Sequence, residues 1–128
     1  MTDPFRQAIA AFNRGDYFGA GEQFEQVQAT AEAGLKDLIG ALSRVAAALH
    51  LRLERGGRQG AINLLSQAML MMDDFGPSMA GIDIGRLSRE LSAFTEDLRA
   101  SPRDEADGLK HRARMFIERR RAPKINFI

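Results

Sequence analysis

Residues 35–53 read LKDLIGALSRVAAALHLRL, and this stretch decides the fold class of the chain. Apolar residues recur there at steps of three and four, namely Leu35, Leu38, Ile39, Leu42, Val45, Ala46, Leu49 and Leu53. Because an α-helix turns once in 3.6 residues, these side chains line one wide apolar face. Such a face is typical of a central, well-buried helix, and Gly56 with Gly57 marks its end.

The rest of the chain also shows helical spacing, and no segment alternates apolar and polar residues as a strand would. Asp3 and Asp16 are expected to cap two helices before the central one. These helices reach about Asn13 and Ala33 and are expected to end at Gly15 and Gly34. Apolar stripes then indicate helices around 62–75 and, after a small loop at 77–82 and a cap at Asp83, around 84–98. A last helix is expected over 102–121, with Pro102 at its start and Asp104 and Glu105 in its first turn.

These segments predict an all-α fold, a compact bundle of about six helices around the third helix. An offset of 41 residues aligns Arg14-Gly15 with Arg55-Gly56, and it also aligns the Gly-Ala pairs 19–20 and 60–61. The alignment predicts two similar helical hairpins on the N-terminal side, although any two helical hairpins share glycine turns. We expect one helical domain over 1–122 and an extended apolar C-terminal tail over 123–128.

Composition excludes several classes of protein. The chain has 128 residues, 45% of them apolar and 27% charged, with a net charge of +1, as expected for one soluble domain. It has no cysteine, which excludes disulfides, thiolate metal sites and cysteine nucleophiles. No apolar run approaches the roughly 18 residues of a membrane span. The first residues lack the order of a signal peptide, so a cytoplasmic location is expected.

The charges are unevenly distributed along the chain. Residues 1–102 carry 10 Lys and Arg against 13 Asp and Glu, whereas residues 103–128 carry 8 against 4. The basic residues of the last segment form a candidate anion-binding set: Lys110, Arg112, Arg119, Arg120 and Arg121. Phosphates of a nucleic acid would favour such a stripe, but a solvated terminal helix is the simpler interpretation.

We expect the last helix to pack through Leu109, Met115 and Phe116, with Arg112 and Arg119 facing outward. The apolar residues of the tail, Ile125, Phe127 and Ile128, are expected to dock onto the body or a neighbouring subunit.

A candidate polar cluster consists of Glu22, Glu25 and His50. The two carboxylates are three residues apart on one helix face, and His50 follows Ala46 by one turn on the central helix. Together they suggest a metal or acid–base site, whereas a buried polar network or partly solvated helix-edge residues are the alternatives. No Glu-x-x-His pair is present, so we predict no catalytic residue, no bound metal and no cofactor.

Residues 12–25 read FNRGDYFGAGEQFE and resemble the signature F-N-x-G-x-Y-F-x-A-H-E-x-x-E-x-x-W of a bacterial and archaeal family, domain of unknown function 309. Segments 36–40, 46–50, 56–61 and 81–84 resemble further parts of that family, so the resemblance runs over 5–98. It implies a compact all-helical bundle with no established activity. It also implies a motif core made of Phe12, Asn13, Gly15, Tyr17, Phe18 and Ala20.

The chain departs from this signature at two positions. Gly21 stands where the signature has the histidine of its His-Glu pair, so the motif is degenerate here, and Gln28 replaces the tryptophan. Any function that depends on that histidine is in doubt for this chain.

The sequence therefore favours a small cytoplasmic helical protein with a non-enzymatic interaction or structural role. Its partner would be another protein or a second copy. Anion or nucleic-acid binding through the basic last helix is one alternative, and a metal or acid–base site at Glu22, Glu25 and His50 is another.

Overall fold

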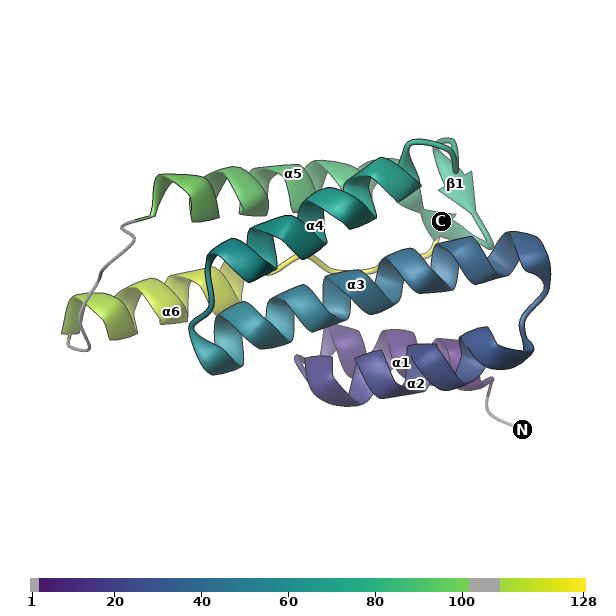
Figure 1. Ribbon diagram of the computed structural model, residues 1–128, viewed down its shortest axis with the longest axis horizontal. Helices are drawn as coiled ribbons and strands as arrows, with labels where there is room; N and C mark the ends of the chain where they lie inside the picture. Colours follow the sequence, from purple (N-terminus) through teal and green to yellow (C-terminus); the bar gives the residue numbers. More distant parts are fainter. Residues whose placement is uncertain (1–2, 102–108) are drawn as a thin grey trace.

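The computed structural model describes residues 3–101 and 109–128, which form six helices and a small hairpin (Figure 1). The elements in chain order are α1 (Pro4–Asn13), α2 (Tyr17–Thr30), α3 (Ala33–Arg55), α4 (Gln59–Met72), β1 (Ser78–Met79), β2 (Ile82–Asp83), α5 (Ile84–Ala100) and α6 (Leu109–Arg121). The predicted all-α fold class is confirmed. The expected helix start at Pro102, Asp104 and Glu105 lies outside the described residues.

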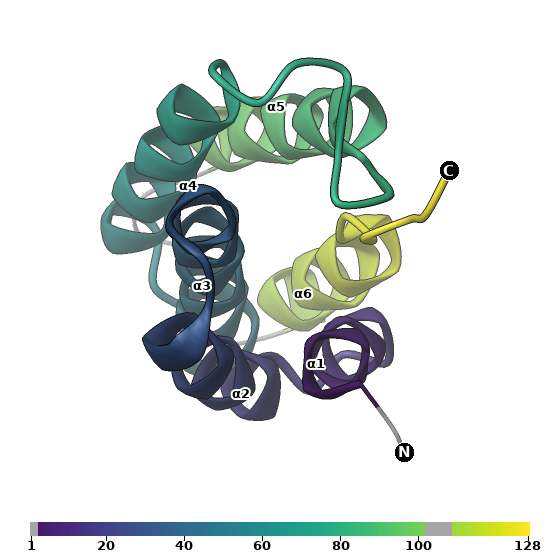
Figure 2. The same cartoon turned by 90° about the vertical axis from the view of Figure 1, so that its right-hand side faces the viewer.

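Helices α1 to α5 form a series in which each of the first four packs against the next helix along the chain. Seen end on, these five helices follow a curve, and α6 lies at its open side between α1 and α5 (Figure 2). Helix α3 contacts α2, α4 and α6, so it has neighbours on three sides. This arrangement leaves α6 and the residues after it to cover the inner side of the curve.

The apolar stripe of α3 forms the centre of the core. Leu38, Ile39, Leu42 and Leu49 are fully buried, and only Leu35, near the start of the helix, is partly exposed. Burial of such side chains stabilises a fold by about 1.5–3 kcal/mol each. The prediction that the third helix is central is confirmed.

Three aspartates cap helices as predicted. Side-chain oxygens of Asp3, Asp16 and Asp83 accept hydrogen bonds from backbone N–H groups of the first turns of α1, α2 and α5, at 2.9, 3.1 and 3.0 Å. These bonds satisfy donors that have no partner within the helix. At the turns of the two N-terminal hairpins, Gly15 and Gly56 have φ of +90° and +73°, a conformation that glycine adopts without strain.

The junction between α2 and α3 differs from the prediction. Helix α2 ends at Thr30, because Ala31 and Glu32 adopt extended backbone angles. The expectation that Gly34 ends the second helix was wrong, since Gly34 lies in the first turn of α3. Glycine destabilises a helix mainly in its interior and is tolerated in the first turn, so a glycine alone is a weak signal of a helix end.

The expected loop at 77–82 contains the hairpin of β1 and β2. Ser78 pairs with Asp83 and Met79 with Ile82, in antiparallel register. The two turn residues, Ala80 and Gly81, have φ of 52° and 77°, and two positive values match the turn type favoured in tight hairpins. Because alanine stands at a position that usually holds Asn, Asp or Gly, the segment carries no hairpin signal.

Candidate functional site

The predicted polar cluster does not form a metal-binding group. Glu22 and Glu25 are on the exposed side of α2, whereas His50 is half-buried on α3 with its ring centroid 5.3 Å from that of Phe18. Within residues 3–101 and 109–128, no three His, Asp or Glu side chains are placed to hold a metal ion. Nδ1 of His50 is buried and has no hydrogen-bond partner in this part of the chain. The helix-face spacing is as expected, but that face is turned to solvent.

Most residues of the predicted motif core are buried or form the turn between α1 and α2. Phe12, Tyr17 and Ala20 are buried, and the rings of Phe12 and Tyr17 meet edge to face with centroids 5.3 Å apart. Gly15 forms the turn between α1 and α2, and Asn13 ends α1. Phe18, by contrast, is 60% exposed and does not belong to the core.

Tyr17 is the residue of the motif core whose pKa is shifted. Burial raises the pKa of its hydroxyl above the ordinary value of 10.0. The nearby Arg119 acts in the opposite direction and lowers this pKa, while Glu54 raises it further. The phenol is therefore neutral at physiological pH, as expected of a core residue with its hydroxyl at the rim.

A buried ion pair fixes α6 to α3. Nε of Arg52 donates to Oε1 of Glu118 at 2.7 Å, and Nη2 donates to Oε2 at 2.8 Å. The two side chains are only 6% and 11% exposed. This paired geometry is the strongest that an arginine and a carboxylate form, so it determines which face of α6 points inward.

A second, exposed ion pair lies next to the buried one. Arg119 donates to Oε1 of Glu54 at 3.0 Å and to the backbone oxygen of Leu53 at 2.7 Å. Arg121 lies 3.9 Å from Asp97 of α5. Two members of the candidate anion-binding set therefore already contact carboxylates of the body, while Lys110, Arg112 and Arg120 are exposed.

The predicted packing face of α6 was wrong. Phe116 and Ile117 are 60% and 47% exposed, Met115 is only partly buried, and the buried side chain of α6 is Glu118. The side chain of Leu109 lies outside what the structure describes. The ion pair explains this orientation, because a buried Arg52 without its carboxylate partner would cost more free energy than an exposed Phe116 ring.

An open groove of about 540 Å³ separates α5 from α6. Its apolar lining includes Phe94, Ala113 and Ile117, and its charged lining includes Lys110, Arg121 and Asp97. Beside it, Arg112, Phe116, Ile117 and Arg120 form what we call the α6 surface, on which the guanidinium of Arg120 lies 5.7 Å from the ring centroid of Phe116. The region thus combines exposed apolar side chains with positive charge.

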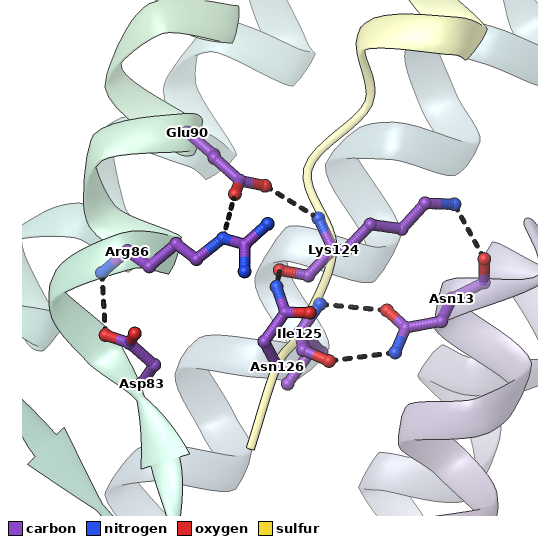
Figure 3. Close-up of polar contacts among 7 residues, drawn as sticks. All are labelled: Asn13, Asp83, Arg86, Glu90, Lys124, Ile125 and Asn126. Carbon is purple, nitrogen blue, oxygen red and sulfur yellow. Dashed lines mark hydrogen bonds and ion pairs between the residues drawn. The ribbon is translucent and has the colours of Figure 1, made fainter. Parts of the chain in front are cut away.

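The tail, residues 123–128, is held in an extended conformation by the body (Figure 3). Asn13 binds Ile125 at both backbone groups, accepting from its N–H and donating to its oxygen, each at 2.8 Å. Oε1 of Glu90 accepts from the N–H of Lys124 at 3.1 Å, while Oε2 of Glu90 accepts from Nε of Arg86 at 2.9 Å. Side chains of α1 and α5 thereby bind the tail from two sides.

The tail also extends the hairpin. The N–H of Asp83 donates to the oxygen of Asn126 at 2.8 Å, and the N–H of Ile128 donates to the oxygen of Gly81 at 2.9 Å. These bonds surround an antiparallel bridge between Ile82 and Phe127. The expected docking onto the body is confirmed for Ile125, which is 1% exposed, whereas the side chain of Ile128 is 82% exposed and does not dock onto the body.

Sequence reasoning missed two functional features of this region. The first is the partnership of Arg52 and Glu118, for which the signals were an arginine between apolar residues of the central helix and the single acid, Glu118, in an arginine-rich segment. The second is the role of Asn13, which the family signature marks but does not explain.

The fold and these contacts define a small, compact all-α protein. Comparison with protein families then shows that residues 5–64 match the model of the Domain of unknown function (DUF309). The match confirms the predicted family resemblance for that segment, which spans α1 to the first part of α4. No curated protein and no solved structure matches the chain. Across the described residues, no helix is both long enough and apolar enough to cross a membrane.

Proposed function

We propose that this protein is a non-enzymatic protein-interaction module whose α6 surface binds an acidic amphipathic helix of a partner protein. The observation that carries the proposal is the exposure of Phe116 and Ile117, at 60% and 47%, beside the groove between α5 and α6. Clustered exposed apolar side chains at a groove are a common feature of binding surfaces. An amphipathic helix places apolar residues at three- and four-residue steps, which suits such a groove.

The charge around these side chains supports an acidic partner. Arg112 and Arg120 lie one helical turn before and after Phe116, and Lys110 lines the neighbouring groove. Carboxylates on the partner would be attracted to these cations and would speed its association. The same charges argue against a second copy, because two α6 helices in contact would place arginines beside arginines.

A synthetic peptide tests the proposal. The probe is a fluorescent amphipathic helix built from leucine and glutamate, and its anisotropy is followed as the protein is added at low and at high salt. We expect saturable binding that weakens with salt, and a loss of at least about tenfold in affinity when Phe116→Ser and Ile117→Ser are combined. Leu70→Ser, which alters an equally exposed apolar residue on α4, is the matched control and should bind normally.

A scrambled peptide of the same composition distinguishes apolar recognition from charge alone. If the scrambled peptide binds equally well, or if the serine variants bind as the native chain does, the proposal is wrong. Anion or nucleic-acid binding is the second candidate function, favoured by the exposure of Lys110, Arg112 and Arg120. In that case labelled single-stranded DNA should bind in a strongly salt-dependent manner, and Arg112→Ala with Arg120→Ala should abolish binding while the serine variants retain it.

A further inference from the structure

The sites that hold the tail recognise mainly its backbone, together with the side chains of Lys124 and Ile125. Four hydrogen bonds join the body to backbone N–H or oxygen atoms of Lys124, Ile125 and Asn126. They come from the side chains of Asn13 and Glu90 and from the edge of β2. We call the groups that make these bonds, together with Gly81, the tail slot. Backbone pairing with the edge of a strand is a general way of binding extended peptides of varied sequence.

Of residues 124–128, only Ile125 has its side chain anchored in the core. Ile125 is 1% exposed, whereas Phe127 and Ile128 are 39% and 82% exposed. The ring of Phe127 lies against the guanidinium of Arg6, 4.5 Å from ring centroid to carbon, which any aromatic residue could reproduce. The slot therefore requires an aliphatic residue at one position and tolerates change at the two that follow Asn126.

The position before the anchor favours a basic residue. Nζ of Lys124 donates to the backbone oxygen of Asn13 at 2.7 Å. Asn13 is the last residue of α1, and the C-terminal end of a helix carries partial negative charge. The carboxylate of Glu90 accepts the backbone N–H of the same lysine from the opposite side of the tail (Figure 3).

We propose that the tail slot is a docking site for an extended segment of a partner protein, with a lysine or arginine followed by an aliphatic residue, and that the tail is its built-in competitor. The inference deepens the interaction function proposed above but uses a different surface, so either can fail alone. A segment tethered to its own site has an effective concentration of about millimolar, so a partner segment binds well only when the tail is released.

The experiment uses the full-length chain with the tail displaced by Ile125→Asp. The buried anchor cannot accept an unpaired carboxylate, so this substitution frees the slot. The probe is a fluorescent peptide with the sequence of residues 122–128, APKINFI. We expect the Ile125→Asp chain to bind this peptide at least about tenfold more tightly than the native chain, whose own tail competes.

Two controls test the recognition that the contacts imply. A peptide with aspartate in place of its isoleucine should not bind, because it lacks the anchor. Adding Asn13→Ala to the Ile125→Asp chain should weaken binding of the normal peptide at least about tenfold, since two hydrogen bonds to its backbone are lost. Phe116→Ser and Ile117→Ser should leave peptide binding unchanged, which separates this proposal from the function assigned to the α6 surface.

The proposal is overturned if the Ile125→Asp chain keeps its helical circular dichroism and does not bind the peptide, or if Asn13→Ala has no effect. If Ile125→Asp unfolds the chain, the peptide must restore the helical signal, or Ile125→Ala must bind it, for the proposal to stand. A dimer of the native chain that forms with increasing concentration and disappears in Ile125→Asp would also overturn the assignment to a different protein, because the second copy's tail would then be the occupant.

Discussion

The ion pair of Arg52 and Glu118 gives the sharpest test of how α6 is held. Glu118→Ala removes the carboxylate bonded to a guanidinium that is 6% exposed, and both of the 2.7 and 2.8 Å hydrogen bonds are lost. Breaking a buried pair in this way costs about 3–5 kcal/mol of unfolding free energy, because the remaining charge has no partner. Each kcal/mol lowers the melting temperature by about 4 °C in a chain of this length, so we expect a decrease of roughly 12–20 °C.

Replacing both partners should restore most of that loss. In the double variant Arg52→Met and Glu118→Leu, no charge is buried, and apolar side chains of similar volume fill the space. We expect a melting temperature close to the native value, so the double variant should be far less destabilised than the sum of the single variants Arg52→Met and Glu118→Leu. Thermal unfolding followed by circular dichroism measures all four chains of this double-mutant cycle.

The neighbouring pair of Arg119 and Glu54 is the matched control, since it joins the same two helices at 3.0 Å but is 46% and 43% exposed. Glu54→Ala should cost at most about 1 kcal/mol, because water replaces the lost partner. If Glu118→Ala were no more destabilising than Glu54→Ala, the inward face of α6 would not depend on the buried pair, and our account of its packing would be refuted.

Three further predictions concern the body of the protein. Leu42→Asp places an unpaired charge in the fully buried centre of α3 and should unfold the chain, so a normal melting temperature would contradict the central position of this helix. The pKa of Tyr17 is raised above 10.0, so the folded chain holds that proton more tightly and should lose stability as the pH rises above this value. As Tyr17 is the only tyrosine and no tryptophan is present, ultraviolet absorbance follows its titration directly, and a midpoint at or below that of the denatured chain would contradict its burial. Gly21→Ala should raise stability by about 0.5–1 kcal/mol, because the added methyl group would meet Ala46 at an ordinary 3.8 Å, and a lower melting temperature would show that the site is tighter than this.

The features that could be predicted from the sequence are those set by neighbours along the chain. The stripe of α3 repeats over five turns, and the caps at Asp3, Asp16 and Asp83 act within three residues, so each signal is complete within one short segment. The end of α2 was placed wrongly because glycine in a first helical turn resembles glycine after a last one. The hairpin of β1 and β2 was missed because its pairing involves two residues on each side, too few for a periodic pattern.

The candidate site depended instead on contacts between distant segments. Periodicity places Glu22 and Glu25 on one face of α2, but it cannot state whether that face meets α3 or solvent, and it meets solvent. In α6 the rule that apolar residues turn inward failed. Glu118 pairs with Arg52, which lies 66 residues earlier in the chain, and this pairing turns Phe116 outward.

Asn13 shows why a motif can be found in a sequence without its purpose being readable there. Its side chain is an amide, so it offers one donor and one acceptor with the spacing of a peptide group, and it pairs with Ile125 as a neighbouring strand would. The partner lies 112 residues later in a segment that has no helical or strand pattern. An asparagine at the end of a helix is usually interpreted as a local cap or turn residue, and the long-range role emerges only when α1 and α5 bring Asn13 and Glu90 to opposite sides of the tail (Figure 3). Asn13 therefore couples the end of α1 to the tail, so substitutions in the motif at 12–20 and in the tail should not be treated as independent.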